Sequence, residues 1–283
     1  MQSLTSEEIR KAVADALAED VGPGDATTLA TVPEQAQARA VMAAREPLVL
    51  AGLSFAKEAF GHLSSGVRFP SELKNGARVE PGAVLLEIHG PARALLTAER
   101  VALNFTQRLS GVATATRAFV DAVAGTKAKI LDTRKTTPGW RRFEKYAVAC
   151  GGGQNHRLGL FDLILIKDNH LVALRDAQPN AIAAAIARAR EHSPSLKVEV
   201  EADTLEQVGQ GIEAGADIIL LDNMSLDDLR AAVKLANGRA LLEASGGVNL
   251  RTVRAIAETG VDYISVGAIT HSARAVDIGL DFL

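Results

Sequence analysis

Residues 197–236, KVEVEADTLEQVGQGIEAGADIILLDNMSLDDLRAAVKLA, contain the pattern that decides the fold. Two short β-forming runs, 197–201 and 217–222, are each followed by apolar residues at helical spacing, in 205–213 and 226–236. Strands that alternate with helices along a chain form a parallel sheet, because a helix must carry the chain back to the start of the next strand. We therefore predict an α/β fold built on parallel strands.

The same alternation continues on both sides of this stretch. Further strands are predicted at 128–133, 162–167, 240–243 and 263–267, and further helices at 141–150, 177–191 and 250–258. Each of the six strands ends in a polar or glycine-rich cluster, and these are Asp132-Thr133-Arg134-Lys135, Lys167 to His170, Glu199 and Glu201, Asp222-Asn223, Glu243 to Gly247, and Gly267. In a parallel barrel all strand C-termini face the active site, whereas an open doubly wound sheet binds its ligand at one switch point. Polar clusters on all six strands favour a barrel.

The first third of the chain has a different pattern. Up to about residue 97, short apolar runs are broken by turn residues, which predicts mixed α and β structure. Residues 97–120 lack proline and carry apolar residues at helical spacing, so one or two helices are expected there. We predict a first domain over 1–110, a barrel domain over 111–271, and residues 272–283 returning to the first domain.

The composition excludes several classes of protein. The 283 residues are 47% hydrophobic and 23% charged, which is ordinary for a globular chain. Lys plus Arg number 31 against 34 for Asp plus Glu, so no global basic field indicates a nucleic-acid partner. Cys150 is the single cysteine, which excludes a disulfide framework and a cysteine metal cage. With no signal peptide and no apolar run near the ~20 residues of a membrane helix, we expect a cytoplasmic protein without a membrane partner.

Basic residues concentrate between two of the predicted strands. The set is Arg134, Lys135, Arg141, Arg142, Lys145, His156, Arg157 and Lys167. On the predicted helix 141–150, we interpret Lys145 and either Arg141 or Arg142 as part of a solvated face. Arg134, Lys135 and Lys167 instead end strands, where a long basic side chain enters the barrel mouth at a cost unless it meets an anion. Guanidinium groups match carboxylates and phosphates, so we predict one of these as the ligand.

Two clusters that contain glycine follow the last two strands, Ser245-Gly246-Gly247 and Val266-Gly267-Ala268. Barrel enzymes often bind a phosphate at this place, through backbone N–H groups and a helix N-terminus. Either cluster alone is as well explained as a turn, but the adjacent pair favours a phosphate site. His271 follows the second cluster and His156 follows a glycine run, and we interpret both as functional positions.

Carboxylates form a third group. Because side chains alternate along strand 197–201, Glu199 and Glu201 share one face, and Asp222 ends the next strand. The set suits Mg²⁺ or ribose hydroxyls, although Glu199 is equally well explained by neutralisation by a Lys or Arg inside the barrel. Mg²⁺ prefers few carboxylates with substrate phosphate and water, so we expect it to arrive at Glu201 and Asp222 with a phosphorylated substrate. The spacings of a zinc site are absent.

The order of the motifs resembles the quinolinate phosphoribosyltransferase family, of the type II phosphoribosyltransferases. The matching stretches are 132–139 (DTRKTTPG), 151–157 (GGGQNHR), 166–170 (IKDNH), 198–201, 220–223, 243–247, 266–268 with His271, and upstream 25–28 (DATT) and 97–100 (TAER). The resemblance covers nearly the whole chain. It implies an N-terminal α/β sandwich domain, an incomplete parallel α/β barrel, and a homodimer or multiple of dimers with active sites shared between subunits.

The resemblance also implies an activity. Members of this family transfer phosphoribosyl from 5-phosphoribosyl 1-pyrophosphate to quinolinate with decarboxylation, giving nicotinate mononucleotide for NAD biosynthesis, with Mg²⁺ and no organic cofactor. Residues that match the family's quinolinate ligands are Arg134, His156, Arg157, Lys167 and, reaching in from the partner subunit, Arg100. Lys135, Glu201 and Asp222 match the catalytic residues at phosphoribosyl pyrophosphate and Mg²⁺. Those that match the 5′-phosphate site are Ser245, Gly246, Gly247, Gly267 and His271.

Three other functions are left open by the residues themselves. Lys167 ends a barrel strand, where class I aldolases place a Schiff-base lysine. The second is a related phosphoribosyltransferase that uses nicotinate or another aromatic acid. The number of arginines that face a second carboxylate separates it from an enzyme that uses quinolinate. A non-catalytic protein that binds a phosphorylated ligand is the third, and its weakness is that Glu201 and Asp222 repel an anion.

Overall fold

The computed structural model describes residues 4–283. They divide into two compact units. Unit 1 comprises the described residues up to Arg117, together with Arg142–Gly152 and Ser272–Leu283. Unit 2 comprises Ala118–Arg141 and Gly153–His271. No helix among the described residues is long and apolar enough to span a membrane.

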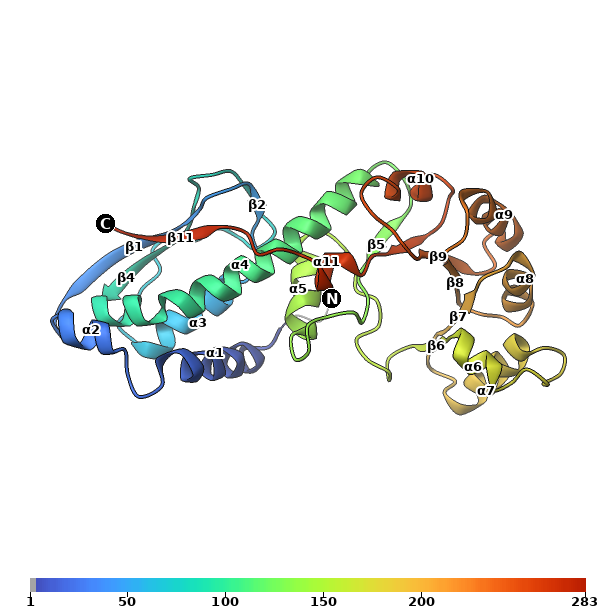
Figure 1. Ribbon diagram of the computed structural model, residues 1–283, viewed down its shortest axis with the longest axis horizontal. Helices are drawn as coiled ribbons and strands as arrows, with labels where there is room; N and C mark the ends of the chain where they lie inside the picture. Colours follow the sequence, from blue (N-terminus) through green and yellow to red (C-terminus); the bar gives the residue numbers. More distant parts are fainter. Residues whose placement is uncertain (1–3) are drawn as a thin grey trace. The chain divides into compact units, whose positions relative to one another are not determined.

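Unit 1 is a small antiparallel sheet with helices. Its elements are α1 (Ser6–Val21), α2 (Ala26–Thr31), β1 (Gln37–Ala44), β2 (Leu48–Val49), α3 (Leu53–Leu63), β3 (Arg78–Val79), β4 (Val84–Pro91), most of α4 (Ala92–Ala122), α5 (Arg141–Cys150) and β11 (Ile278–Phe282). Strand β1 pairs antiparallel with β4 on one side and with β11 on the other (Figure 1). The last strand of the chain therefore lies at the edge of a sheet formed by the first part of the chain.

The division between the units differs from the boundary that the sequence predicts. Helix α4 crosses residues 110 and 111 without a break, and unit 2 begins at Ala118. Helix α5 belongs to unit 1, where the ring of Phe143 packs edge-on against Phe55 with centroids 5.1 Å apart. Aromatic packing of this kind buries a large apolar area, which explains why α5 is part of the first core.

Helix α5 also corrects the interpretation of its basic residues as a solvated face. Lys145 is only 4% exposed. Arg142 donates to both carboxylate oxygens of Glu8 at 2.8 and 3.2 Å. Glu144 is fully buried and accepts a hydrogen bond from Arg108 at 2.8 Å. A charged residue is tolerated inside a core when an opposite charge meets it, and sequence spacing does not reveal such distant partners.

Unit 2 contains the predicted parallel sheet. Its strands are β5 (Lys129–Leu131), β6 (Ile164–Ile166), β7 (Val198–Ala202), β8 (Ile218–Asp222), β9 (Leu241–Ser245) and β10 (Tyr263–Ser265), and its helices are α6 (Asp168–Val172), α7 (Ala181–His192), α8 (Leu205–Glu213), α9 (Leu226–Ala236), α10 (Val253–Ala257) and α11 (Ala268–His271). The strands are parallel in the order β5-β10-β9-β8-β7-β6. Since β5 and β6 stand at the two ends of this order, the barrel is incomplete, as predicted.

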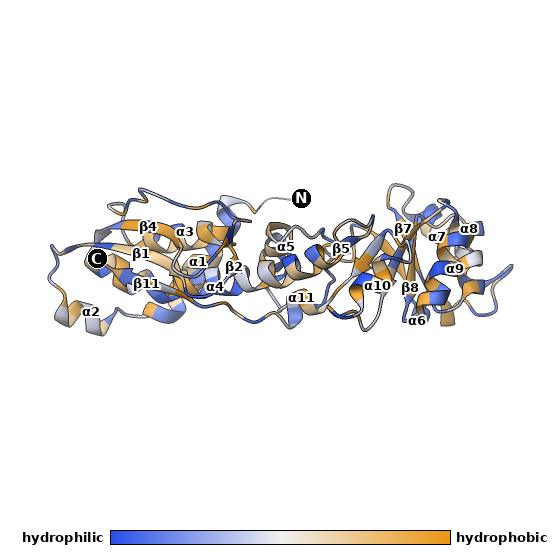
Figure 2. Ribbon diagram, turned by 90° about the horizontal axis from the view of Figure 1, so that it is seen from above, coloured by the Kyte–Doolittle hydropathy of each residue, from blue (hydrophilic) through white to orange (hydrophobic). Residues whose placement is uncertain are grey.

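Amphipathic helices cover the outer side of this sheet (Figure 1). Helix α8 buries Val208 completely, and a Cβ added to Gly211 would lie 3.2 Å from side-chain atoms of both Val200 and Ile219. Glycine there lets the helix approach β7 and β8 closely. Figure 2 shows β8 coloured as hydrophobic and α9 with both hydrophilic and hydrophobic residues. Each large aliphatic side chain that is buried between the helices and the sheet stabilises the unit by about 1.5–3 kcal/mol. This packing helps to hold the ends of the strands in register.

Candidate active site

A cavity of about 340 Å³ lies at the C-terminal ends of the parallel strands, within unit 2. Its lining residues are Thr133, Arg134, Lys135, His156, Arg157, Leu165, Lys167, Leu220, Glu243, Ser245 and Ser265. They come from β6, β8, β9 and β10, from the loop after β5, and from the segment before β6. This is the place where a parallel barrel presents catalytic groups.

Four basic side chains of the predicted anion site meet in this cavity. Arg134 and Lys135 come from the loop after β5, Lys167 follows β6, and Arg157 lies in the segment between these two strands. Arg134 is half-buried, and its Nε is shielded from solvent without a hydrogen-bond acceptor. Burial, followed by the charge of Arg134, lowers the pKa of Arg157. Cations crowded in this way are stabilised by an anionic ligand, which the cavity has room to admit.

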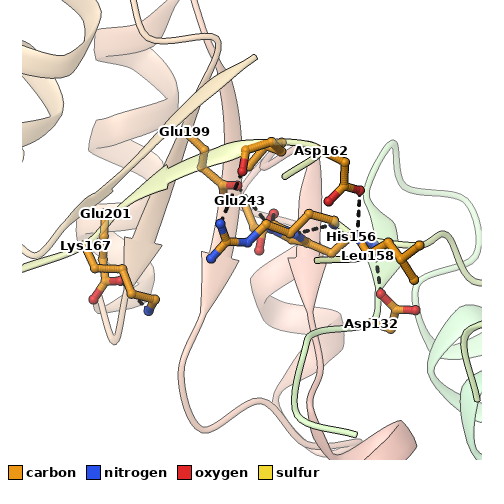
Figure 3. A network of polar contacts seen from close by, with 10 residues as sticks. Asp132, His156, Leu158, Asp162, Lys167, Glu199, Glu201 and Glu243 are labelled. Atoms are coloured by element: carbon orange, nitrogen blue, oxygen red, sulfur yellow. Dashed lines mark hydrogen bonds and ion pairs between the residues drawn. The ribbon is translucent and has the colours of Figure 1, made fainter. Parts of the chain in front are cut away.

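Two aspartates fix the segment that carries Arg157 (Figure 3). Asp132 is fully buried and accepts hydrogen bonds from the backbone N–H of His156 at 2.8 Å and the side-chain amide of Asn155 at 2.7 Å. Asp162 accepts from the backbone N–H groups of the two residues after Arg157, at 2.7 and 2.9 Å. Sequence reasoning did not assign these positioning roles. The position of Asp132 at the end of a strand, directly before the basic residues, was the available signal.

Three carboxylates gather beside the four basic side chains of the cavity. Oxygen atoms of Glu201, Asp203 and Asp222 all lie within 4.8 Å of one another. Lys167 reaches the same group, because its Nζ lies 2.8 Å from Glu201 Oε2 (Figure 3). The structure therefore pairs Lys167 with Glu201, although the family resemblance implies separate roles for them. Asp203 was missed from the sequence, although its spacing from Glu201 continues the alternation of the strand.

Two further glutamates lie deeper. Glu199 on β7 is fully buried and Glu243 on β9 is 1% exposed. Nε2 of His156 lies 3.1 Å from Glu199 Oε2 and 3.4 Å from Glu243 Oε2. The close partner of Glu199 is thus a histidine rather than the Lys or Arg considered from the sequence. Burial, followed by the charge of Glu199, raises the pKa of Glu243 to about 8.

The glycine clusters follow β9 and β10. Gly246 has φ +97°, and a Cβ added there would lie 2.0 Å from the side-chain oxygen of Asn223. A Cβ on Gly267 would lie 3.1 Å from His271 Nε2 and 3.2 Å from the Lys135 side chain. Glycine at both positions permits these close approaches. The fold therefore brings Gly267 and His271 next to Lys135.

Arg100 is the one predicted site residue outside unit 2. It lies on α4 in unit 1 and is exposed. The remaining predicted residues all belong to unit 2, within or beside the ends of its strands.

Comparisons with known proteins cover nearly the whole chain. Residues 25–110 match the family model for the N-terminal domain of quinolinate phosphoribosyl transferase, and 112–281 match that for its C-terminal domain. A nicotinate-nucleotide pyrophosphorylase (carboxylating) of Mycobacterium leprae is 47% identical over 280 residues, which cover 96% of each chain. A probable enzyme of the same name from Bacillus subtilis is 45% identical over 93% of this chain and 89% of its own.

Solved structures agree. NadC from Streptococcus pyogenes superposes with a TM-score of 0.94 and 42% identity over 100% of both chains. The nicotinate-nucleotide pyrophosphorylase from Francisella tularensis gives 0.93 with 41% identity, over 99% of this chain and 98% of its own. Human nicotinic acid phosphoribosyltransferase, at 14% identity and a TM-score of 0.60, shares the fold alone. Matches to both domains, and relatives above 40% identity along almost their full lengths, establish that this chain belongs to the quinolinate phosphoribosyltransferase family.

Proposed function

We propose that this chain transfers the phosphoribosyl group of 5-phosphoribosyl 1-pyrophosphate to quinolinate, with release of pyrophosphate and CO₂, to give nicotinate mononucleotide for NAD biosynthesis. The observation that carries the proposal is the cavity on which Arg134, Lys135, Arg157 and Lys167 converge, beside a cluster of carboxylates. Both substrates are multiply anionic, whereas the transition state between them carries positive charge on the ribose. Cations and carboxylates side by side suit this combination.

Quinolinate carries two adjacent carboxylates on a pyridine ring. Arg134 and Arg157 present planar guanidinium groups that match carboxylates in pairs of hydrogen bonds, and Lys167 adds a point charge. His156 lines the cavity beside them. Arg100 is the further cation implied by the family, and we propose that it acts on the site of a partner subunit. The chain would then work as a homodimer or a multiple of dimers.

The phosphoribosyl group would occupy the side of the cavity with the glycines. Ser245 lines the cavity, and the backbone of Gly246 and Gly247 follows it. Gly267 lies close to both His271 and Lys135, so the side chains of these two residues can reach one phosphate there. We assign this side to the 5′-phosphate, with Lys135 directed toward the departing pyrophosphate.

The carboxylate cluster fits Mg²⁺. Its donors are all oxygen atoms, the ligands that this ion prefers, and they lie within 4.8 Å of one another. We propose that Glu201 and Asp222 hold Mg²⁺, directly or through water, when it arrives with phosphoribosyl pyrophosphate, and that Asp203 supports them. An Mg²⁺ held by these residues would supply positive charge to neutralise the pyrophosphate. Because Lys167 is paired with Glu201, substrate binding must redistribute this contact.

Catalysis would depend on position and charge. As pyrophosphate leaves C1 of the ribose, the carboxylates of Glu201 and Asp222 stabilise the oxocarbenium character of the ring, and Lys135 stabilises the leaving group. The pyridine nitrogen attacks the opposite face of C1. The resulting pyridinium withdraws electrons, so the 2-carboxylate leaves as CO₂ and the ring carbon takes a proton. These steps require no organic cofactor.

The rival functions fit the site less well. Lys167 is in an ion pair with Glu201, whereas a Schiff-base lysine must be uncharged to attack a carbonyl. A simple phosphate-binding protein has no use for three carboxylates beside the anion site. Nicotinate has one carboxylate and would therefore leave some of the basic side chains of the cavity without an anionic partner. A cytoplasmic location stays a prediction.

The choice of acid is tested by supplying quinolinate or nicotinate, in separate reactions, with Mg²⁺ and phosphoribosyl pyrophosphate. We expect nicotinate mononucleotide from quinolinate and little or none from nicotinate. Formation of nicotinate mononucleotide from nicotinate but not from quinolinate would contradict the proposal. It would indicate a nicotinate phosphoribosyltransferase instead. Heat-inactivated protein is the control.

A further inference from the structure

Arg141 belongs to the basic set of the sequence, yet the reaction proposed above gives it no role. It is the first residue of α5, is counted with unit 2 and is half-buried. In the described part of the chain, Arg141 is not among the residues that line the cavity. Its contribution to the site must therefore come from the groups to which its guanidinium donates hydrogen bonds.

The guanidinium of Arg141 joins two segments of unit 2. Its Nε donates to Thr136 Oγ1 at 3.1 Å, and its Nη1 donates to the carbonyl oxygen of Leu158 at 3.2 Å. A longer hydrogen bond, of 3.4 Å, runs from Nη2 to the carbonyl oxygen of Arg134. These three acceptors are uncharged oxygens, so the planar group serves here as a rigid fork of donors. Arg141 thus ties the loop after β5 to the segment before β6.

The two segments carry the two arginines that we assign to quinolinate. On one side, Arg141 contacts the backbone of Arg134 itself. On the other side, its acceptor Leu158 directly follows Arg157, whose guanidinium donates to the carbonyl oxygen of Leu163 at 3.2 Å. The carboxylates of quinolinate have a fixed separation, so two guanidinium groups recognise both only at a matching spacing. A side chain that holds both segments helps to set that spacing.

Lys135, on the same loop, is held by other groups. Its backbone N–H donates to Thr133 Oγ1 at 2.9 Å, and its carbonyl oxygen accepts from Thr270 Oγ1 at 2.7 Å. Neither hydrogen bond involves Arg141. A change at Arg141 should therefore disturb the binding of quinolinate more than the binding of phosphoribosyl pyrophosphate.

We propose that Arg141 is a positioning residue that sets the spacing between Arg134 and Arg157 for an acid with two adjacent carboxylates. This inference rests on the proposed function for its substrate. Arg141 acts through backbone and hydroxyl oxygens and does not touch the acid. Lysine cannot replace it, because one ammonium nitrogen does not reproduce a fork that reaches acceptors in two segments.

Steady-state kinetics of Arg141→Lys test the selectivity. We expect the KM for quinolinate to rise about 10-fold and the KM for phosphoribosyl pyrophosphate to change by less than about 3-fold. Arg142→Lys is the matched control, because the guanidinium of Arg142 donates to Glu8 in unit 1. It should lower the melting temperature and leave both KM values unchanged. Equal rises in the two KM values of Arg141→Lys, or no rise for quinolinate, would overturn the proposal.

Double variants test whether Arg141 acts through the two arginines. Arg141→Lys is combined with Arg134→Lys and, separately, with Arg157→Lys. We expect Arg141→Lys to raise the KM for quinolinate less in each of these backgrounds than in the wild type, because the guanidinium that it positions is already absent. The same fold-change in all three backgrounds would show an independent contact with the acid and refute the proposal.

Amide hydrogen exchange of the free protein tests the joining of the segments without any substrate. We expect Arg141→Lys to exchange faster than the wild type over 133–137 and 155–163, with unchanged exchange in β7, β8 and β9. If this variant does not fold, Thr136→Val removes one acceptor and should give a smaller change of the same kind. Unchanged exchange in both segments would overturn the proposal. A wild-type protein that does not turn over quinolinate would instead refute the proposed function, and the exchange would still show whether Arg141 joins the segments.

Discussion

Replacing Gly246 by alanine should disable the phosphate side of the site, and Gly247 provides a matched control. Both glycines have positive φ, +97° and +59°, which an alanine tolerates at a cost of about 1–2 kcal/mol. A Cβ on Gly247 meets nothing within 4 Å. On Gly246 it would lie 2.0 Å from the side-chain oxygen and 3.0 Å from the backbone nitrogen of Asn223. The two variants therefore share the backbone strain and differ in the steric clash.

The clash has a definite local consequence. The Asn223 side chain must rotate away, which breaks its hydrogen bond to Asp222 Oδ2 at 2.7 Å, worth about 1 kcal/mol at an exposed position. The tight contact with the backbone nitrogen adds further strain. Together these give an excess destabilisation of about 2 kcal/mol for Gly246→Ala over Gly247→Ala, or a melting temperature lower by about 4–8 °C.

Thermal denaturation and the KM for phosphoribosyl pyrophosphate measure the two effects. We expect Gly246→Ala to melt below Gly247→Ala and to raise this KM, because the loop N–H groups move. An Asn223→Gly background lacks both the clashing side chain and its hydrogen bond, at a residue with φ +52°, so Gly246→Ala should lower the melting temperature less there than in the wild type. Equal melting temperatures for the two alanine variants, or the same loss from Gly246→Ala in both backgrounds, would refute the steric argument.

Three further predictions concern other parts of the chain. Arg134→Lys loses the paired geometry of a guanidinium, so quinolinate should bind about 10- to 100-fold more weakly by calorimetry, and wild-type affinity would refute its assignment. Arg142, first among several hydrogen-bond donors, lowers the pKa of Glu8 to about 2, so this pair stabilises the fold above pH 4.5 and its contribution is lost as the pH falls toward 2. Glu8→Gln should cost about 1–2 kcal/mol at pH 7 in urea titrations and nothing near pH 2, and a loss that is the same at both pH values would contradict this reasoning. Arg100→Ala and Lys135→Ala should each be inactive yet regain activity when their subunits are mixed, and no recovery after confirmed exchange would argue against shared sites.

The sequence predicted those parts of the fold that local patterns encode. Helices α8 and α9 lie at the predicted bounds, because apolar spacing and the N-caps Thr204 and Ser225 define them locally. The parallel sheet followed from the alternation of strands and helices. Helix α10 is shorter than the predicted 250–258, since regular helix begins only at Val253.

Contacts between residues that are far apart along the chain could not be predicted from the sequence. Lys145 has a spacing typical of a solvated helix position, yet tertiary packing buries it. The partner of Glu199 is His156, 43 positions away by their residue numbers, and alternation along a strand does not indicate which side chain will meet it. The pairing of Lys167 with Glu201 likewise depends on the register between β6 and β7. Arg134, Lys135 and Lys167 were predictable as a set because they end or follow strands, but their individual neighbours were not.

The proposed reaction couples phosphoribosyl transfer to decarboxylation, and an isotope-labelled substrate measures this coupling. Purified protein is incubated with Mg²⁺, phosphoribosyl pyrophosphate and quinolinate labelled in its 2-carboxylate, while labelled CO₂ and nicotinate mononucleotide are followed together. We expect both products to form in equal amounts and only when phosphoribosyl pyrophosphate is present. Nucleotide that retains the label, CO₂ release without phosphoribosyl pyrophosphate, or no turnover of quinolinate would contradict this expectation.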